Sequence, residues 1–161
     1  MKGFKESEIN KSGNNKIQKS KNNNSALIQN ALIFQNKGEL NEAAKIYHKL
    51  IKNKFYDEKV FLNYASICQQ QNNFNDAILL FREAIKINPK NFIPFFKMGF
   101  ILNNIGRFYE AYPFAKKAID LKPDLWEGYH NLIKILRSLN KPKDAANFAE
   151  KAKNLFSSNH L

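Results

Sequence analysis

Residues 72–89 read NNFNDAILLFREAIKINP, and residues 106–123 read GRFYEAYPFAKKAIDLKP. The second stretch begins 34 residues after the first, and both carry a turn residue, an acid, two alanines and a proline at equivalent positions. The first alanine of each stretch also recurs one step outside them, at Ala43 and Ala145. A period of roughly 20–50 residues is typical of stacked repeats, because one such unit cannot bury its apolar face alone. The interval therefore predicts a repeat protein that extends well beyond the two stretches.

Each unit contains two stretches with the apolar periodicity of a helix. In the first unit this period runs over residues 27–34, stops, and resumes over residues 40–51. The pattern predicts two amphipathic helices joined by a tight turn. The turn position holds only Gly or Asn, which tolerate a positive φ better than other residues. Its four occurrences are Gly38, Asn72, Gly106 and Asn140. An all-α fold follows.

Small, aromatic and proline residues complete the repeat. The second unit carries Tyr64, Ala65, Cys68, Asn72, Phe74, Ala77, Phe81, Ala84 and Pro89. The third carries Met98, Gly99, Leu102, Gly106, Phe108, Ala111, Ala115, Ala118 and Pro123. We expect the small residues to let the two helices approach closely, with Gly99 facing Ala111. The proline ends the second helix, because it cannot continue it.

This pattern resembles the tetratricopeptide repeat family over residues 24–157. The resemblance implies an α-solenoid, a right-handed superhelix of helix-turn-helix repeats, with repeats near 24–57, 58–91, 92–125 and 126–157. The first unit departs from the family at Phe55, which stands where the proline is expected. The fourth departs at Ile133, Pro142 and Lys153. A terminal repeat is expected to be atypical, because its outer face meets water.

The ends of the chain differ from the repeats. Residues 1–23 are rich in Lys, Asn and Ser and have few apolar side chains. Such a segment cannot bury enough surface to offset its ordering entropy, so we predict a disordered basic tail there. Residues 158–161 form a short C-terminal tail after the repeats. The apolar Leu155 and Phe156 near this end predict weak self-association.

The formal net charge is +12. A basic surface can attract nucleic acid, an anionic membrane surface or an acidic peptide. However, the lysines are dispersed over the tail, the turns and both helices of each unit, and no RNA- or DNA-binding motif accompanies them. The positive charge is therefore better explained by a general over-use of Lys, Asn, Ile and Phe than by a nucleic-acid partner.

The sequence offers no catalytic constellation. The three histidines have no metal-binding spacing, no Gly-rich phosphate loop occurs, and the single cysteine, Cys68, is expected to be a buried and unreactive core residue. We predict a protein without enzymatic activity, metal or cofactor. No apolar run predicts a membrane span, and the lack of cysteine pairs favours a cytoplasmic location. Pro113 is predicted to kink the second helix of the third unit or to delay its start.

In the family, the first helices of the repeats line a concave groove that binds other proteins. The resemblance places ten residues on this lining: Ile28, Gln29, Leu32, Leu62, Asn63, Phe96, Lys97, Phe100, Asn131 and Lys134. The basic clamp by which some members capture a C-terminal carboxylate is incomplete here. Gln29, Asn63 and Asn131 instead resemble the asparagine ladder by which other members hold peptide backbone. With Lys97 and Lys134, the lining favours a partner segment with apolar anchors and some acidic character.

We therefore expect a scaffold or adaptor that binds an extended peptide or short helix in its concave groove. Two alternatives remain open. The chain can be the N-terminal or split targeting module of a bacterial glycosyltransferase or sulfotransferase, since such enzymes resemble it in carrying a basic tail and a few repeats. A basic surface that binds RNA is the weaker alternative. In every case the sequence leaves the partner unnamed.

Overall fold

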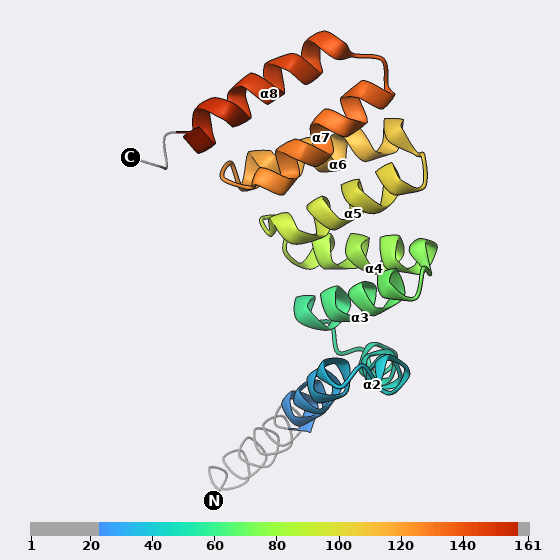
Figure 1. Ribbon diagram of the computed structural model, residues 1–161. Helices are drawn as coiled ribbons and strands as arrows, with labels where there is room; N and C mark the ends of the chain where they lie inside the picture. Colours follow the sequence, from blue (N-terminus) through green and yellow to red (C-terminus); the bar gives the residue numbers. More distant parts are fainter. Residues whose placement is uncertain (1–22, 158–161) are drawn as a thin grey trace, which may run out of the picture. The chain divides into compact units, whose positions relative to one another are not determined.

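The computed structural model describes residues 23–157, and the secondary structure of this part of the chain is entirely helical (Figure 1). The described residues fall into two compact units, and the boundary in the sequence lies between Tyr56 and Asp57. The predicted tails lie outside the described residues, with the exception of Asn23, which belongs to the first helix rather than to the N-terminal tail. The all-α prediction is confirmed.

The N-terminal unit is one helix pair, formed by the helix over residues 23–36 and by α2 (Leu40–Lys52). The pair buries Ala31 from the first helix against a stripe of α2. This stripe, Ala43, Tyr47 and Leu50, recurs every three to four residues, as an amphipathic helix requires. The hydroxyl of Tyr47 donates a hydrogen bond to Oε1 of Gln35 at 2.8 Å, which satisfies the polar end of a buried side chain.

The C-terminal unit contains three helix pairs in series. Its helices are α3 (Glu58–Gln70), α4 (Phe74–Ile87), α5 (Phe92–Asn104), α6 (Phe108–Leu121), α7 (Trp126–Ser138) and α8 (Pro142–Ser157). The two helices of each pair pack together, α4 packs on α5, and α6 packs on α7. The first helices α5 and α7 also contact each other directly. Figure 1 shows the resulting stack from α3 to α8.

The turns within the pairs have the backbone that the sequence predicts. All four turn residues have a positive φ, between 55° at Asn140 and 79° at Gly38. At the end of α3, the N–H of Asn73 donates to the carbonyl of Cys68 at 2.8 Å, five residues back. Together with the bond from the N–H of Asn72 to the carbonyl of Gln69, this is the Schellman motif that closes a helix.

The second helices end in two different ways. Helices α4 and α6 end just before Pro89 and Pro123. Helix α2, which lacks the proline, ends in a Schellman motif in which the N–H of Phe55 donates to the carbonyl of Leu50 at 3.0 Å. This motif places Lys54 at a φ of 59°, a conformation that costs a non-glycine residue about 1–2 kcal/mol. The departure at Phe55 thus has a structural consequence at its neighbour.

The loop after α4 is held by a side chain of the same repeat. Asn88 and Asn91 both donate side-chain hydrogen bonds to the carboxylate of Glu58, at the start of α3. Asn91 also caps α5, because its side-chain oxygen accepts the N–H of Ile93 at 2.9 Å. A single carboxylate therefore connects the start of one repeat to the start of the next.

The core of the C-terminal unit runs through all three pairs without a break, from Ala65 and Cys68 on α3 to Ala145 and Ala152 on α8. Close helix approach depends on small residues, but the contact at Gly99 differs from the predicted one. A Cβ on Gly99 would lie 2.9 Å from the backbone N of Ala115, one turn beyond Ala111. The closest approach is thus one turn beyond the predicted Ala111, because helices that cross at an angle are closest at one point only.

Helix α6 is continuous from Phe108 to Leu121, with Pro113 inside it. The predicted delay of the helix start is therefore wrong. Pro113 and Tyr109 are both exposed, so the Tyr109 carbonyl that loses its hydrogen bond lies on the solvent side of the helix. Water can satisfy that carbonyl, which lowers the cost of an interior proline. The alternative of a local kink stays a prediction.

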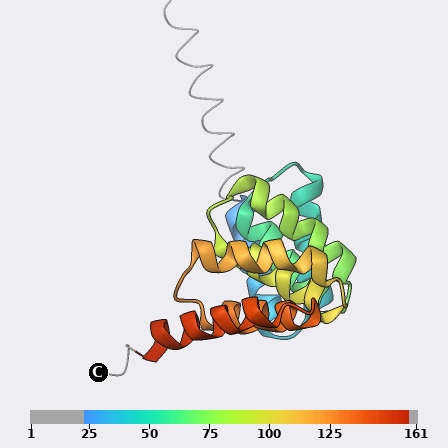
Figure 2. The same cartoon turned by 90° about the horizontal axis from the view of Figure 1, so that it is seen from above.

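Helix α8 is the outermost helix at the C-terminal end of the stack (Figure 2). It buries Ala145 and Ala152 and exposes Lys153 to water. Phe156 packs back on α7 with its ring 5.2 Å from that of Trp126, in an edge-to-face arrangement. Of the two apolar residues behind the predicted self-association, only Leu155 is exposed, at 39%.

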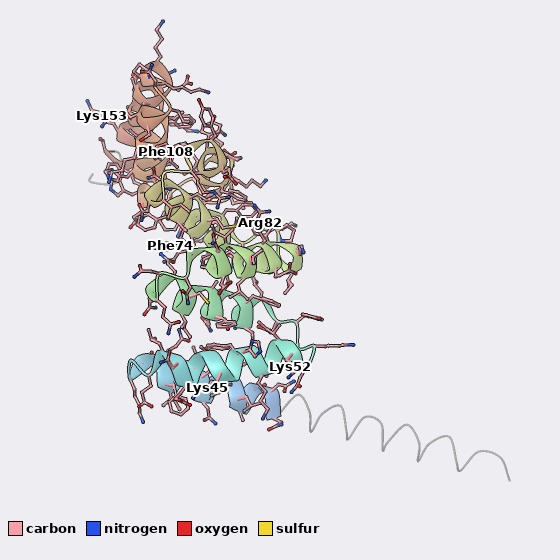
Figure 3. The ribbon with its side chains drawn as sticks, turned by 90° about the vertical axis from the view of Figure 1, so that its right-hand side faces the viewer. Lys45, Lys52, Phe74, Arg82, Phe108 and Lys153 are labelled. Atoms are coloured by element: carbon pink, nitrogen blue, oxygen red, sulfur yellow. The ribbon has the colours of Figure 1, made fainter. Side chains whose placement is uncertain are left out.

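Basic side chains are distributed over many helices. The four that Figure 3 labels belong to three of them: Lys45 and Lys52 to α2, Arg82 to α4 and Lys153 to α8. The figure also marks Phe74 and Phe108, which occupy equivalent places at the starts of α4 and α6. Among residues 23–157, no helix combines the length and the apolar character that crossing a membrane requires.

Candidate functional site

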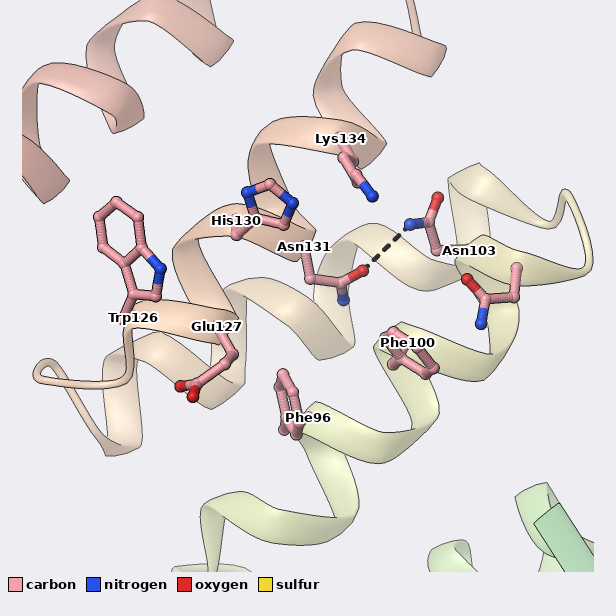
Figure 4. A pocket seen from close by; sticks show the side chains of 9 residues that line it. Phe96, Phe100, Asn103, Trp126, Glu127, His130, Asn131 and Lys134 are labelled. Atoms are coloured by element: carbon pink, nitrogen blue, oxygen red, sulfur yellow. Dashed lines mark hydrogen bonds between the residues drawn. The ribbon is translucent and has the colours of Figure 1, made fainter. Parts of the chain in front are cut away.

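A pocket of about 420 Å³ opens between α5 and α7, the first helices of two successive repeats (Figure 4). A volume of this size accommodates one or two side chains of a bound segment. All of its lining residues come from these two helices: Phe96, Phe100, Asn103, Asn104, Trp126, Glu127, His130, Asn131 and Lys134.

The helical period brings the lining residues onto two facing surfaces. On α5, Phe96 and Phe100 are four residues apart, as are Glu127 and Asn131 on α7. Residues at this spacing lie above one another on the same face of a helix. The direct contact of α5 with α7 then sets the two faces against each other. The site is therefore a consequence of the repeat itself, which aligns equivalent faces of successive first helices.

Aromatic rings form the apolar part of the pocket. The rings of Phe96 and Phe100 are 6.4 Å apart with their planes tilted by 34°. Phe100 is 40% exposed and Trp126 is 53% exposed, which is unusual for side chains of this size. Phe96 also packs against the small cluster of Phe95, Ala118 and Leu125, so its position is fixed by the core.

Asn131 supplies a polar group in the middle of this apolar surface. Its side chain is only 4% exposed, and its Oδ1 accepts a hydrogen bond from Nδ2 of Asn103 at 3.0 Å. Nδ2 of Asn131 is buried without any hydrogen-bond partner. In Figure 4 this nitrogen points away from Asn103, toward Phe96 and Phe100. A buried donor without a partner is costly, and it gains free energy when a ligand supplies an acceptor.

Charged groups occupy opposite ends of the pocket. Glu127 lies beside Phe96, whereas Lys134 lies near Asn103 (Figure 4). Within residues 23–157, neither side chain takes part in a salt bridge. Glu127 belongs to the first turn of α7, where the helix dipole favours its negative charge. The pocket thus presents an acceptor at one end and donors in the middle and at the other end.

The structure brings together four of the ten residues that the sequence places in the groove: Phe96, Phe100, Asn131 and Lys134. Leu62 and Asn63 on α3 and Lys97 on α5 are half-buried and do not line this pocket. Leu62 packs instead against the main core. Ile28, Gln29 and Leu32 belong to the helix over residues 23–36 in the N-terminal unit.

Five lining residues were outside the predicted site: Asn103, Asn104, Trp126, Glu127 and His130. Glu127 and His130 stand at repeat positions that face the groove in the family. Their positions in the repeat could therefore have predicted that they line the site. Trp126 stands at the very start of α7, and Asn103 and Asn104 at the end of α5. Helix ends are the least certain part of a sequence-based assignment, which is why these three were missed.

Cys68 occupies the core rather than a reactive site. The thiol is 4% exposed, and burial together with the charge of Asp76 raises its pKa. Since the thiolate is the nucleophile, a raised pKa makes the thiol less reactive at neutral pH. The prediction of a buried residue at this position is confirmed.

Comparison with known proteins gives the same architecture. The chain resembles crystal structures of the protein MamA, one with a TM-score of 0.80 and 18% identity over 90% of this chain and 85% of that chain. A second MamA structure has a TM-score of 0.78 and 18% identity, covering 86% of this chain and 76% of that one. A third, of MamA AMB-1, has a TM-score of 0.74 and 21% identity, with 80% and 70% covered. These similarities concern the fold alone. No curated protein shows significant sequence similarity.

Two parts of the sequence match models of the tetratricopeptide repeat, residues 58–91 and residues 95–125. The matches fall on the helix pairs α3–α4 and α5–α6, and the other two pairs have the same turn geometry at Gly38 and Asn140. Stacked repeats of this kind form scaffolds for protein–protein interaction, because the series of helices presents an extended binding surface. Residues 58–91 and 95–125 are therefore tetratricopeptide repeats.

Proposed function

We propose that this protein is a non-catalytic adaptor that binds a segment of another protein in the pocket between α5 and α7. The observation that carries the proposal is the combination of exposed aromatic rings with an unpartnered buried donor in one concave site. The exposed rings of Phe100 and Trp126 contact water in the free protein. A bound apolar side chain removes this apolar area from water, which favours binding. The donor on Asn131 adds a directional polar contact.

The size and shape of the pocket suit part of a peptide better than a whole folded domain. About 420 Å³ accommodates one or two side chains, and the remainder of a bound segment would continue along the first helices. The half-buried Leu62, Asn63 and Lys97 lie on α3 and α5 of the same unit and are candidates for these further contacts. The six remaining groove predictions, including Ile28, Gln29 and Leu32 in the N-terminal unit, stay predictions.

The test is a pull-down with the full chain as bait, compared with the double variant Phe96→Ala, Phe100→Ala. Aromatic anchors of an interface commonly lose about 2 kcal/mol or more on truncation, so the double variant should lose its partner. Tyr109→Ala, an exposed aromatic on α6 outside the pocket, is the matched control and should retain it. Circular dichroism verifies the fold of both. A folded double variant that keeps the partner would place the site elsewhere.

A further inference from the structure

We propose that the pocket selects partner segments by a basic side chain, Lys or Arg. The cationic head meets the carboxylate of Glu127 beside Phe96, while a carbonyl of the same segment accepts a hydrogen bond from Nδ2 of Asn131. This inference rests on the proposed function and specifies the chemistry of the segment that the site takes.

The first argument is the orientation of the Asn131 amide. Because Nδ2 of Asn103 donates to Oδ1 of Asn131 at 3.0 Å, the oxygen of Asn131 is already engaged. Nδ2 of Asn131, in contrast, is buried without a partner. An asparagine with both groups free can pair with the N–H and the C=O of a peptide. The unpartnered group of Asn131 is a donor, so it calls for an acceptor from the ligand, and every peptide unit carries a carbonyl.

The second argument is the carboxylate of Glu127. It lines the pocket next to an aromatic ring and, within the described part of the chain, forms no salt bridge. A carboxylate beside aromatic faces suits a cation, because the ring quadrupole and the negative charge attract the same group. Trp126, the strongest cation–π acceptor among the side-chain types, borders the same pocket. An apolar ligand would gain nothing from the charge of Glu127, which is exposed.

The third argument is the distance between the two groups. Glu127 and Asn131 are four residues apart on α7, and the Cβ atoms of residues at this spacing are separated by about 5–6 Å. A Lys or Arg side chain extends its charged head from the backbone by a comparable length on an apolar stem. One residue can therefore place its carbonyl at Asn131 and its charge at Glu127, while the stem covers Phe96.

Lys134 gives the bound segment a direction. It lies at the end of the pocket opposite Glu127, so it repels a cationic head placed there and favours carbonyl oxygen. The expectation of an acidic partner was based on Lys97 and Lys134 together, and this expectation changes. Lys97 does not line the pocket, whereas Glu127 does. The net charge of +12 has little influence at this range, because charges farther away than about 8 Å are largely screened at physiological salt.

The experiment uses a random short-peptide library displayed on phage, with the full chain as the selecting protein. Parallel selections use Glu127→Lys and the control Glu150→Lys, whose exposed carboxylate lies on α8 outside this pocket. We expect the wild-type chain and the control to enrich peptides with an excess of Lys or Arg. The Glu127→Lys variant should instead enrich Asp or Glu. An unchanged preference in this variant would overturn the inference.

One enriched peptide is then titrated as a matched pair, with its Lys present or replaced by norleucine, which keeps the stem and removes the charge. Trp126 is the single tryptophan of the chain and borders the pocket, so its fluorescence reports binding at this site. Glu127→Gln should weaken the Lys peptide roughly fivefold, the effect of an exposed ion pair, and leave the norleucine peptide unchanged. Asn131→Leu, checked for its fold by thermal melting, should weaken both peptides equally.

The two levels of the proposal fail in different ways. If no library peptide binds in a manner that depends on Phe96 and Phe100, the proposed function itself is overturned. If peptides bind through these rings but show no basic excess, or if Glu127→Gln weakens both members of the pair alike, only the selection by a basic side chain is overturned.

Discussion

Asn103 and Asn131 join the first helices of two successive repeats through a side-chain hydrogen bond of 3.0 Å. Asn131 is 4% exposed, so the bond also satisfies a buried carbonyl oxygen. Asn103→Ala removes the donor and leaves both polar atoms of Asn131 unpaired. An unsatisfied buried group costs about 1–3 kcal/mol, and we expect a loss of this size in the free energy of unfolding.

The matched control for this prediction is Asn104→Ala, because Asn104 also lines the pocket but is exposed. Urea unfolding of the two variants gives the comparison. A loss as small for Asn103→Ala as for Asn104→Ala would mean that water replaces the bond and that the pair does not hold α5 to α7.

We predict that Gly99 cannot accept a methyl group unless the backbone moves. Its added Cβ would lie 2.9 Å from the backbone N of Ala115, and a backbone atom cannot rotate away. We expect Gly99→Ala to lower the free energy of unfolding by about 1–3 kcal/mol, as overpacking does. Gly128→Ala is the comparison, since its Cβ would meet side-chain atoms of Ile119 and Leu125, at 2.8 and 2.9 Å, rather than backbone. A larger loss for Gly128→Ala would contradict the assignment of Gly99 as the closest helix contact.

Lys54 offers a test of the strained end of α2. Its φ of 59° is a conformation that glycine adopts without a penalty. We predict that Lys54→Gly raises the thermal stability of the N-terminal unit, with a gain of up to about 1 kcal/mol after the greater chain entropy of glycine is subtracted. Lys52→Gly, at the last helical position of α2, should lower stability instead. If both substitutions lower the melting temperature, the Schellman end of α2 is not the native one.

The Glu58 carboxylate accepts side-chain hydrogen bonds from both Asn88 and Asn91. Glu58→Ala should therefore destabilise the C-terminal unit by about 1.5–3 kcal/mol, the range for a hydrogen bond to a charged acceptor. Glu150→Ala removes an exposed glutamate of the same unit and is expected to have little effect. Equal melting temperatures for the two variants would show that the loop after α4 holds its conformation without Glu58.

Cys68 makes stability depend on pH in a defined direction. Burial raises the pKa of its thiol above the ordinary value in the unfolded chain. The unfolded chain therefore loses the thiol proton first, and the contribution of Cys68 to stability is complete below the unfolded pKa and declines as the pH rises through the folded one. Because the chain has a single cysteine, the thiol reagent DTNB reports this residue alone. We expect slow labelling at neutral pH that accelerates on unfolding. Labelling at the same rate in folded and unfolded protein would contradict the buried position.

The 34-residue interval predicted the repeat, its turns and its close helix pairs, because each of these features depends on local chemistry at a fixed position. A positive φ at Asn72 and Asn140 follows from the residue type and its place after an apolar period. What the pattern could not predict depends on angles between helices. The closest approach of Gly99 to Ala115 is of this kind. The tolerance of Pro113 inside α6 depends instead on which side of the helix meets water.

The site was predictable to the extent that it follows the repeat. Phe96, Phe100, Asn131 and Lys134 were placed on the first helices by their register, and they surround one pocket. The hydrogen bond between Asn103 and Asn131 was not predictable, because it joins residues 28 positions apart whose side-chain directions depend on the packing of α5 on α7. That bond decides which atom of Asn131 is available, and hence the chemistry expected of a ligand.

The most direct test of the account replaces Phe100, in the pocket, or Tyr109, on α6, by a photo-crosslinking phenylalanine analogue in the full chain. Both positions are exposed aromatics, at 40% and 83%, so the analogue is tolerated at either one. Irradiation of the two variants in the cells that produce the protein, followed by mass spectrometry, identifies what contacts each position. We predict that one partner protein crosslinks through a short segment at position 100 and is absent at position 109. The same partner at position 109, with none at position 100, would contradict binding between α5 and α7.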